Sequence, residues 1–107
     1  MSAELATQRL RRVLELTPQP PKAPDPDAVI DASDEMLRSR EVELDGLRVI
    51  LERKPGILKG NQECREIRDE ISLRDRQWSD ALDWAQRELA KRRLAGQRAR
   101  QAQRAYR

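Results

Sequence analysis

The sequence predicts an all-α protein: an elongated, coiled-coil-like antiparallel helical hairpin with a long second helix. Three observations support this prediction. An apolar seam recurs about every 3.5 residues through the second half of the chain, a Pro-Gly break separates it from a similar seam, and charge is abundant. Of the 107 residues, 37% are hydrophobic and 38% are charged, whereas charged residues make up about a quarter of a typical domain. This balance is typical of a thin helical assembly that buries one stripe of each helix.

The longest predicted helix extends from Ile57 to Tyr106, or begins as late as Gln62 with Asn61 as its N-cap. No proline interrupts this stretch. At a rise of about 1.5 Å per residue, such a helix would be about 60–70 Å long. Its expected seam comprises Ile57, Gly60, Cys64, Ile67, Ile71, Arg74, Trp78, Leu82, Ala85, Leu89, Arg92, Ala95, Ala99, Ala102 and Tyr106.

The first long helix of the hairpin is expected to begin near Asp27, a candidate cap or first-turn acid, and to end at Lys54-Pro55-Gly56. Pro-Gly favours a turn, and the residue before a proline is disfavoured in a helix. The chain should therefore double back, with Ile30 near Trp78 and the second helix projecting beyond the first after about Ala81. The expected seam is Ile30, Ser33, Leu37, Arg40, Leu44, Leu47 and Leu51, widened by Val29, Met36, Val49 and Ile50.

The organisation along the chain is predicted as a short amphipathic helix (residues 1–16), a proline-rich linker (17–26) and the hairpin with its basic C-terminal helix (27–107). For the short helix two interpretations are open. Either it packs loosely and frays, because helices this short are marginal alone, or it docks Leu10 and Leu14 into a groove of this protein or of a partner.

The linker contains five of the six prolines, in the sequence TPQPPKAPDP. Proline removes a backbone donor and fixes φ, so this stretch is expected to be extended and semi-rigid. A plain linker explains this composition. A proline-rich ligand motif is the alternative interpretation, because Pro18 and Pro21 have the PxxP spacing.

The residues of an enzyme active site are not found in this sequence. Histidine is absent, which removes the commonest general base and metal ligand, and no phosphate-binding glycine loop, nucleophile elbow or CxxC motif occurs. The single cysteine, Cys64, lies on the seam and is expected to be a buried apolar residue rather than a reactive thiol. We therefore expect a non-enzymatic protein without a cofactor or metal.

Apolar runs in the sequence are short. None approaches the roughly 20 residues of a membrane span, and the N-terminus lacks the apolar run of a signal peptide. The expectation is a cytoplasmic protein with no membrane span.

Trp78 and Trp84 are predicted to have different roles. Trp78 lies on the seam and is expected in the core. Trp84 is six residues later, about 240° around the helix, on a polar face. A large aromatic residue there needs a cover from another helix, a second subunit or a partner, unless its ring lies along its own helix over a basic side chain.

The C-terminal end of the chain is strongly basic. Residues 87–107 carry eight Lys/Arg against one acid, Glu88, a net charge of +7, whereas residues 1–54 carry nine bases against eleven acids, a net charge of −2. A basic helix attracts phosphate, an acidic membrane surface or an acidic protein. The predicted basic patch is Lys91, Arg92, Arg93, Arg98, Arg100 and Arg104.

The order of these parts resembles the flagellar type III export chaperones of the FliT and FlgN kind, over about residues 35–107. The resemblance rests on the stretch EMLRSREVELDGLRVILE, a short break, the stretch CREIRDEISLRDRQWSDALDWAQREL and an arginine-rich end closing in Ala105-Tyr106. It implies a small cytoplasmic helical protein that holds filament-cap or hook-associated subunits before export. It also implies a partner-binding helix that has on it or near it Trp78, Leu82, Trp84, Leu89 and Tyr106.

The leading functional hypothesis is a chaperone- or adaptor-like protein-interaction module that binds a helical partner through the long C-terminal helix. It rests on surplus apolar surface, because a two-helix hairpin buries only one side of each helix, so self-association or a client must supply the cover. The alternatives are nucleic-acid binding through the arginine-rich helix and a structural coiled-coil component of a larger assembly. The predicted partner-binding residues are Leu10, Leu14, Leu82, Trp84, Leu89 and Tyr106.

Overall fold

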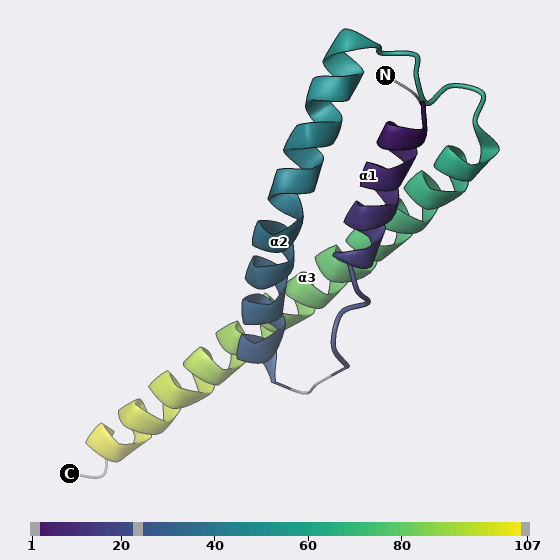
Figure 1. Ribbon diagram of the computed structural model, residues 1–107. Helices are drawn as coiled ribbons and strands as arrows, with labels where there is room; N and C mark the ends of the chain where they lie inside the picture. Colours follow the sequence, from purple (N-terminus) through teal and green to yellow (C-terminus); the bar gives the residue numbers. More distant parts are fainter. Residues whose placement is uncertain (1–2, 23–24, 106–107) are drawn as a thin grey trace.

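The computed structural model describes residues 3–22 and 25–105, which form three α-helices. Helix α1 spans Ala3–Glu15, α2 spans Pro26–Arg53 and α3 spans Gln62–Ala105. Helices α2 and α3 run antiparallel, and α1 packs against both near their connected end (Figure 1). The molecule measures 73 × 21 × 18 Å with a radius of gyration of 20.3 Å, against about 13 Å for a compact domain of this length. The predicted all-α, elongated hairpin with a long C-terminal helix is confirmed.

The connection between α2 and α3 begins at the predicted Pro-Gly break and ends in a helix cap. Gly60 has a φ of 82°, a left-handed conformation that glycine adopts without the steric cost of a Cβ. The side-chain oxygen of Asn61 then accepts a hydrogen bond from the backbone N–H of Cys64 at 3.2 Å. This cap satisfies one of the free donors of the first turn. Helix α3 therefore begins at Gln62, the later of the two predicted starts.

Asp27, predicted as a cap or a first-turn acid, is a first-turn acid of helix α2. Asp25 is the cap, because its carboxylate accepts a hydrogen bond from the Asp27 backbone N–H at 3.1 Å. Pro26, assigned to the linker from sequence, is the first helical residue. Proline suits this position because its φ is helical and its missing N–H would have no partner in the first turn.

The core lies where α1 fits between α2 and α3, and all three helices contribute buried side chains to it. Cys64 is fully buried there, as predicted, with its sulfur 3.1 Å from the hydroxyl of Thr7 on α1. The buried members are Ala6, Leu10, Leu47, Ile50, Leu58, Cys64 and Ile67, and Leu5, Leu14, Leu51, Ile57 and Ile71 pack against them.

Helix α1 docks on this protein, which decides between the two interpretations of the short helix. Val13 is 1% exposed and Leu10 is 4% exposed. An ion pair of 3.2 Å joins Arg9 to Glu43 of α2. The Arg9 guanidinium lies against Gly46, where any Cβ would collide with it. The expectation of a loosely packed or fraying helix is therefore wrong.

The buried face of α2 is rotated relative to the predicted seam. Met36 is 6% exposed, whereas Leu37, which was expected to face α3, is 48% exposed. One residue corresponds to about 100° around a helix. The rotation arises because α2 packs against α1 as well as α3, which agrees with the predicted widening of the apolar face by Val29, Met36 and Ile50. The buried positions of α2 are Pro26, Val29, Ser33, Met36, Leu47 and Ile50.

Candidate partner-binding surface

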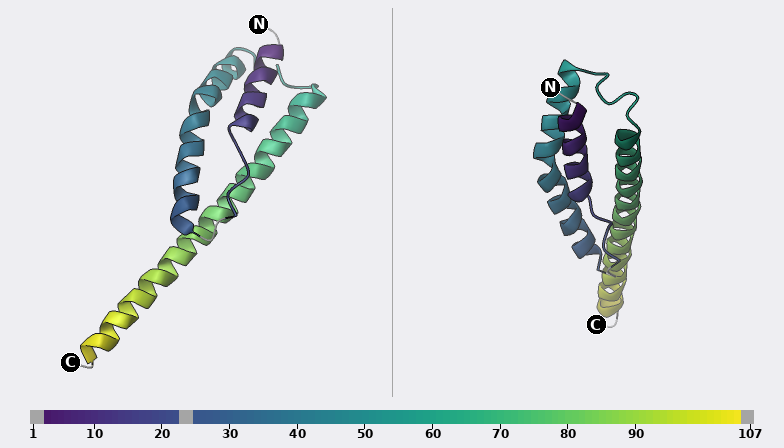
Figure 2. Two further views of the ribbon diagram at one scale, coloured as in Figure 1. Left: turned by 60° about the horizontal axis from the view of Figure 1, so that its bottom comes forward. Right: turned by 45° about the vertical axis from the view of Figure 1, so that its right-hand side comes forward.

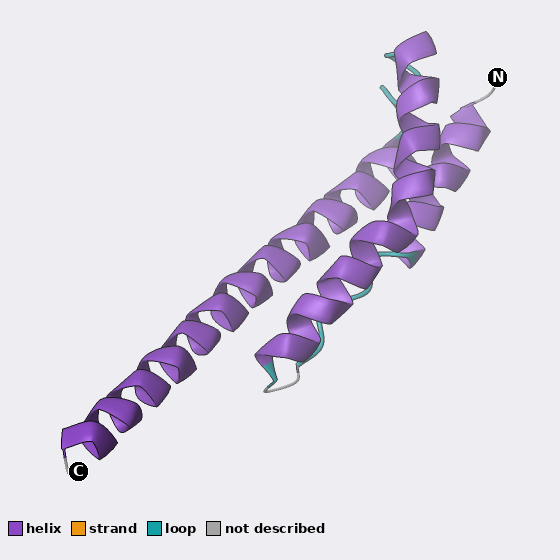
Figure 3. Cartoon of the chain, turned by 90° about the vertical axis from the view of Figure 1, so that its left-hand side faces the viewer, coloured by secondary structure: helices purple, strands orange, loops and turns teal. Residues whose placement is uncertain are grey.

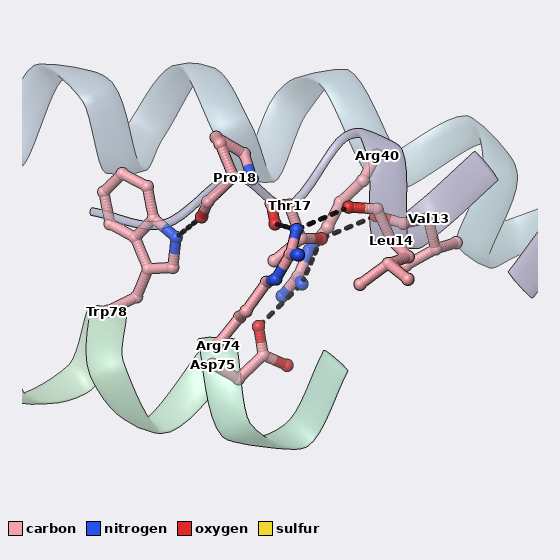
Figure 4. A network of polar contacts seen from close by, with 8 residues as sticks. All are labelled: Val13, Leu14, Thr17, Pro18, Arg40, Arg74, Asp75 and Trp78. Carbon is pink, nitrogen blue, oxygen red and sulfur yellow. Dashed lines mark hydrogen bonds and ion pairs between the residues drawn. The ribbon is translucent and has the colours of Figure 1, made fainter. Parts of the chain in front are cut away.

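A polar network fixes the end of α1 and the start of the linker to the hairpin (Figure 4). Arg74 of α3 donates hydrogen bonds from Nη1 to the carbonyl of Thr17 at 2.9 Å and to that of Leu14 at 3.4 Å. Carbonyls at a helix C-terminus lack intrahelical partners and carry partial negative charge. Arg74 thus stands on the predicted apolar seam because its guanidinium caps a neighbouring helix.

Arg40 of α2 joins the same network from the other side. Its Nη1 donates to the Asp75 carboxylate at 2.7 Å and to the Thr17 hydroxyl at 3.2 Å, and its side chain is 11% exposed. The Thr17 hydroxyl in turn donates to the Val13 carbonyl at 2.6 Å. Three separate elements, the end of α1, α2 and α3, are therefore held in fixed positions relative to one another.

Trp78 is in the core, as predicted, and it also holds the linker. Its ring is 3% exposed, and its indole N–H donates to the Pro18 carbonyl at 2.7 Å (Figure 4). A groove of about 390 Å³ opens beside it, between the linker and α2. None of the predicted partner-binding residues that the structure describes lines this groove. Its walls are formed by Glu15, Leu16, Pro18, Gln19, Pro21, Ala32, Glu35, Met36, Ser39 and Trp78.

The second half of α3 extends alone beyond the rest of the molecule (Figure 2). Ala85 is the last buried residue of the described part of α3. We call residues 88–105 the projecting segment; its 18 residues correspond to about 27 Å of helix. It begins later than the predicted point near Ala81 because α2 starts at Pro26, about one turn before Ile30.

The projecting segment presents its cations to solvent. It carries six bases and one acid, Glu88, a net charge of +5. All six bases are exposed. Within the described residues only Arg92 among them forms an ion pair, with Glu88 at 3.8 Å. The bases are the predicted patch, Lys91, Arg92, Arg93, Arg98, Arg100 and Arg104.

The predicted partner-binding residues lie in different settings. Leu10 and Leu14 both contact the core of this protein, so α1 uses them for docking within the chain. Leu82 and Leu89 are half-buried on α3, near the point where the cover of α2 ends. Leu10 and Leu14 thus belong to intrachain packing, whereas Leu82 and Leu89 stay partly accessible.

Trp84 remains a solvent-accessible aromatic residue at the base of the projecting segment. It is 39% exposed, consistent with its predicted position off the seam. Tyr106, the last predicted contact residue, lies outside the described residues.

Two exposed leucines of α3 were missed by the sequence reasoning. Leu94 is 53% exposed in the middle of the projecting segment, and Leu73 is 44% exposed. Leu73 precedes Trp84 by eleven residues, which places the two about 20° apart around the helix and so on one face. Both leucines were off the predicted seam, and an apolar residue off a seam is the signal that would have identified them.

An acidic surface lies on the outer side of α2. Residues 25–37 contain five acids and no base, all five are exposed, and in the described chain none of them forms an ion pair. The helical positions of Asp27, Asp31 and Asp34 share one face, about 180° from buried Met36. We call these five residues the acidic face: Asp25, Asp27, Asp31, Asp34 and Glu35.

The described part of the chain has neither a candidate metal-binding cluster nor a helix that could span a membrane. In residues 3–22 and 25–105, no three or more His, Cys, Asp or Glu side chains are grouped so that they could hold a metal ion. The described helices include none with the length and apolar character needed to span a bilayer.

Comparisons of the chain with protein-family models, with curated proteins and with solved structures yielded no match. The similarity to flagellar export chaperones therefore stays a prediction from the sequence.

Proposed function

We propose that the protein is a non-enzymatic interaction module, chaperone- or adaptor-like, which binds a helical protein partner through the second half of α3. The observation that carries this proposal is the projecting segment, which no other helix of the described chain accompanies (Figure 3). Helices in proteins owe most of their stability to tertiary packing of one face. A helix of about 27 Å without such packing has a free surface for a partner.

The rest of the molecule supports this proposal because it presents the helix in a defined position. Helix α1, α2 and the first half of α3 form a packed head, and the Arg74 and Arg40 hydrogen bonds lock its elements together. A binding helix that is already formed and oriented loses less conformational entropy on association than a disordered one. The head thus holds the binding helix in a fixed position.

The side chains near and on the projecting segment suit a protein partner. Trp84 and Leu94 are 39% and 53% exposed, and partly exposed aromatic residues are frequent anchors of protein interfaces. The surrounding bases favour a partner with acidic residues on its contact surface. The resemblance to flagellar export chaperones offers one version of this proposal, in which the partner is an export subunit held in the cytoplasm.

Nucleic-acid binding is the second candidate, favoured by the six exposed bases on one helix. Each phosphate neutralised on duplex DNA would lower log K by about 0.9 per log unit of salt. The acidic face on α2 opposes this candidate, because it would repel a phosphate backbone near the base of the segment. A structural coiled-coil component of a larger assembly would use the same uncovered helix and is a special case of protein binding.

The test is affinity capture from nuclease-treated lysate of the native host, using the full chain and a chain that lacks residues 95–107. The deletion removes no buried residue of the described chain, so the head should fold in both. A protein captured by the full chain and lost with the deletion supports the proposal. Because the deletion retains Trp84 and Leu94, a third chain carries Trp84→Ala and Leu94→Ala. Equal capture by all three chains contradicts the proposal, and capture that requires nucleic acid favours the second candidate.

A further inference from the structure

Among the residues that the structure describes, two surfaces of opposite charge have no ion-pair partners from other elements. The projecting segment has a net charge of +5, and residues 25–37, which include the acidic face, have a net charge of −5. We propose that the projecting segment binds the acidic face of a second copy of this chain, so that two chains form an antiparallel dimer. This inference rests on the proposed function, because it names the partner of the same helix.

The two surfaces cannot meet within one chain. Helix α3 is continuous from Gln62 to Ala105, and it carries the projecting segment away from the start of α2 (Figures 1 and 3). The side of α2 that packs in the molecule includes Val29 and Met36, and Asp27, Asp31 and Asp34 of the acidic face lie opposite it. Only another molecule can therefore bring a base of the projecting segment to these carboxylates.

A two-fold arrangement would pair both surfaces twice. If two α3 helices run antiparallel and overlap at the bases of their projecting segments, the end of each segment passes along the start of the other chain's α2. Residues 94–105 and residues 26–37 are each about 18 Å of helix, so the two lengths match. In such an isologous contact each projecting segment binds the acidic face of the other chain, so neither surface is left unpaired.

The side chains on these two helix faces are complementary. On the projecting segment Lys91, Leu94 and Arg98 share a face at steps of three and four residues, and Leu94 is 53% exposed. On α2, exposed Leu37 borders the face that carries Asp31 and Asp34. In this register Leu94 lies level with the start of the other chain's α2, and Leu37 of that α2 lies level with the end of the projecting segment. Each leucine is therefore covered at a different end of the contact, while the bases between them approach the acids.

A second copy accounts for more of the observations than a nucleic acid does. A nucleic acid would use the projecting segment alone and would be repelled by the acidic face. A second copy uses both surfaces and covers exposed apolar side chains on each. It also requires nothing beyond the chemistry of this chain.

A charge-swap experiment tests the dimer by sedimentation velocity over a range of concentrations. The first variant carries Lys91→Glu and Arg98→Glu, and the second carries Asp31→Lys and Asp34→Lys. Each creates like-charge contacts in its own dimer, so the dissociation constant should rise by about tenfold or more. An equimolar mixture of the two variants should restore association, because each altered surface then meets one of opposite charge.

The matched control for the second variant carries Glu52→Lys and Asp69→Lys, which make the same change of net charge as Asp31→Lys and Asp34→Lys at exposed positions outside both surfaces. It should dimerise as the unaltered chain does, and circular dichroism should show equal helix content in all variants. Raising the salt from about 0.1 M to about 1 M shortens the Debye length from about 10 Å to about 3 Å and should weaken the dimer.

Three results would overturn the dimer: an unaltered chain that stays monomeric, reversed variants that associate as well as the control, or a mixture that fails to associate. A monomer that still captures a host protein through residues 95–107 would overturn the dimer and leave the proposed function standing. A monomer whose capture survives both the deletion of those residues and the Trp84→Ala and Leu94→Ala changes would overturn both.

Discussion

The two halves of α3 have the same backbone conformation and are stabilised by different forces. From Gln62 to about Ala85 the helix is packed against α1 and α2, and its seam is buried. The projecting segment that follows has no such packing and is exposed along nearly all its length. An uninterrupted helix can therefore be a core element at one end and a free surface at the other. Secondary structure alone does not reveal where the change occurs.

The largest predicted effect tests the packed half. Trp78→Ala removes a ring that is 3% exposed and a hydrogen bond to the linker. Deleting a buried large aromatic costs about 3–5 kcal/mol, a large part of the stability of a small domain. We expect a strongly lowered Tm or loss of the fold, measured by thermal unfolding with circular dichroism. A Tm close to that of the unaltered chain would show that the core is not centred on this residue.

The next effect tests the attachment of α1. Arg74→Met keeps an apolar stem but removes the charged donor of the Thr17 carbonyl, while the Leu14 carbonyl keeps its hydrogen bond from the Thr17 backbone N–H. Burying unsatisfied polar groups costs about 1–3 kcal/mol. Amide hydrogen exchange in α1 should accelerate more than in α2. Arg76→Met, at an exposed position of the same helix, is the control and should leave exchange in α1 unchanged.

A smaller effect on stability, with a separate effect on binding, is expected at Trp84. This residue is 39% exposed, so Trp84→Ala should change the free energy of unfolding by no more than about 1 kcal/mol. If it anchors the partner, association should weaken by about 2 kcal/mol or more. Thermal unfolding and a binding titration in parallel separate the two. Unfolding by Trp84→Ala together with tolerance of Trp78→Ala would reverse the assignment of the two faces.

The smallest effect sharpens the comparison within the projecting segment. Gly96→Ala places a methyl group where the nearest atom, in the Arg100 side chain, is 3.9 Å away. Alanine favours a helix interior over glycine by about 1 kcal/mol. Hydrogen exchange around residue 96 should slow while the Tm of the head stays the same. A raised Tm would show that the segment unfolds together with the head.

The fold was largely predictable from the sequence because its signals are local. The 3.5-residue spacing of the α3 seam, the Pro-Gly break and the Asn61 cap each act within a few residues, and each appears in the structure. The cap of α2 was missed because Asp25 and Asp27 are both plausible acids next to Pro26. Which of the two acids is the cap depends on where the helical backbone begins, and it begins at Pro26.

The arrangement of the helices was less predictable because it depends on distant contacts. The docking of α1 rotates the buried face of α2 toward Met36 and away from Leu37. The same contact explains Arg74, whose charge looked out of place on an apolar seam until the end of α1 supplied carbonyls for it. The spacing of apolar residues and the composition describe each helix by itself. They contain little information on where a third helix packs.

The candidate surface was predictable in charge and only partly in its apolar residues. The basic patch follows directly from the sequence, whereas Leu94 was missed because it lies off the predicted seam. Leu10 and Leu14 proved to be intrachain contacts, since a docking helix and a core helix have the same amphipathic pattern. The acidic face was not predicted, because whether these acids point to solvent depends on which side of α2 is buried.

The contact between Thr7 and Cys64 makes the single thiol a built-in probe of the motion of α1. Cys64 is fully buried, and its sulfur lies 3.1 Å from the α1 hydroxyl. A thiol reagent can reach it only when the protein opens, so the labelling rate measures the opening equilibrium without any added reporter group. With one cysteine in the chain, the signal comes from a single site. Slower labelling on adding a partner would show that binding to α3 tightens the distant helix α1.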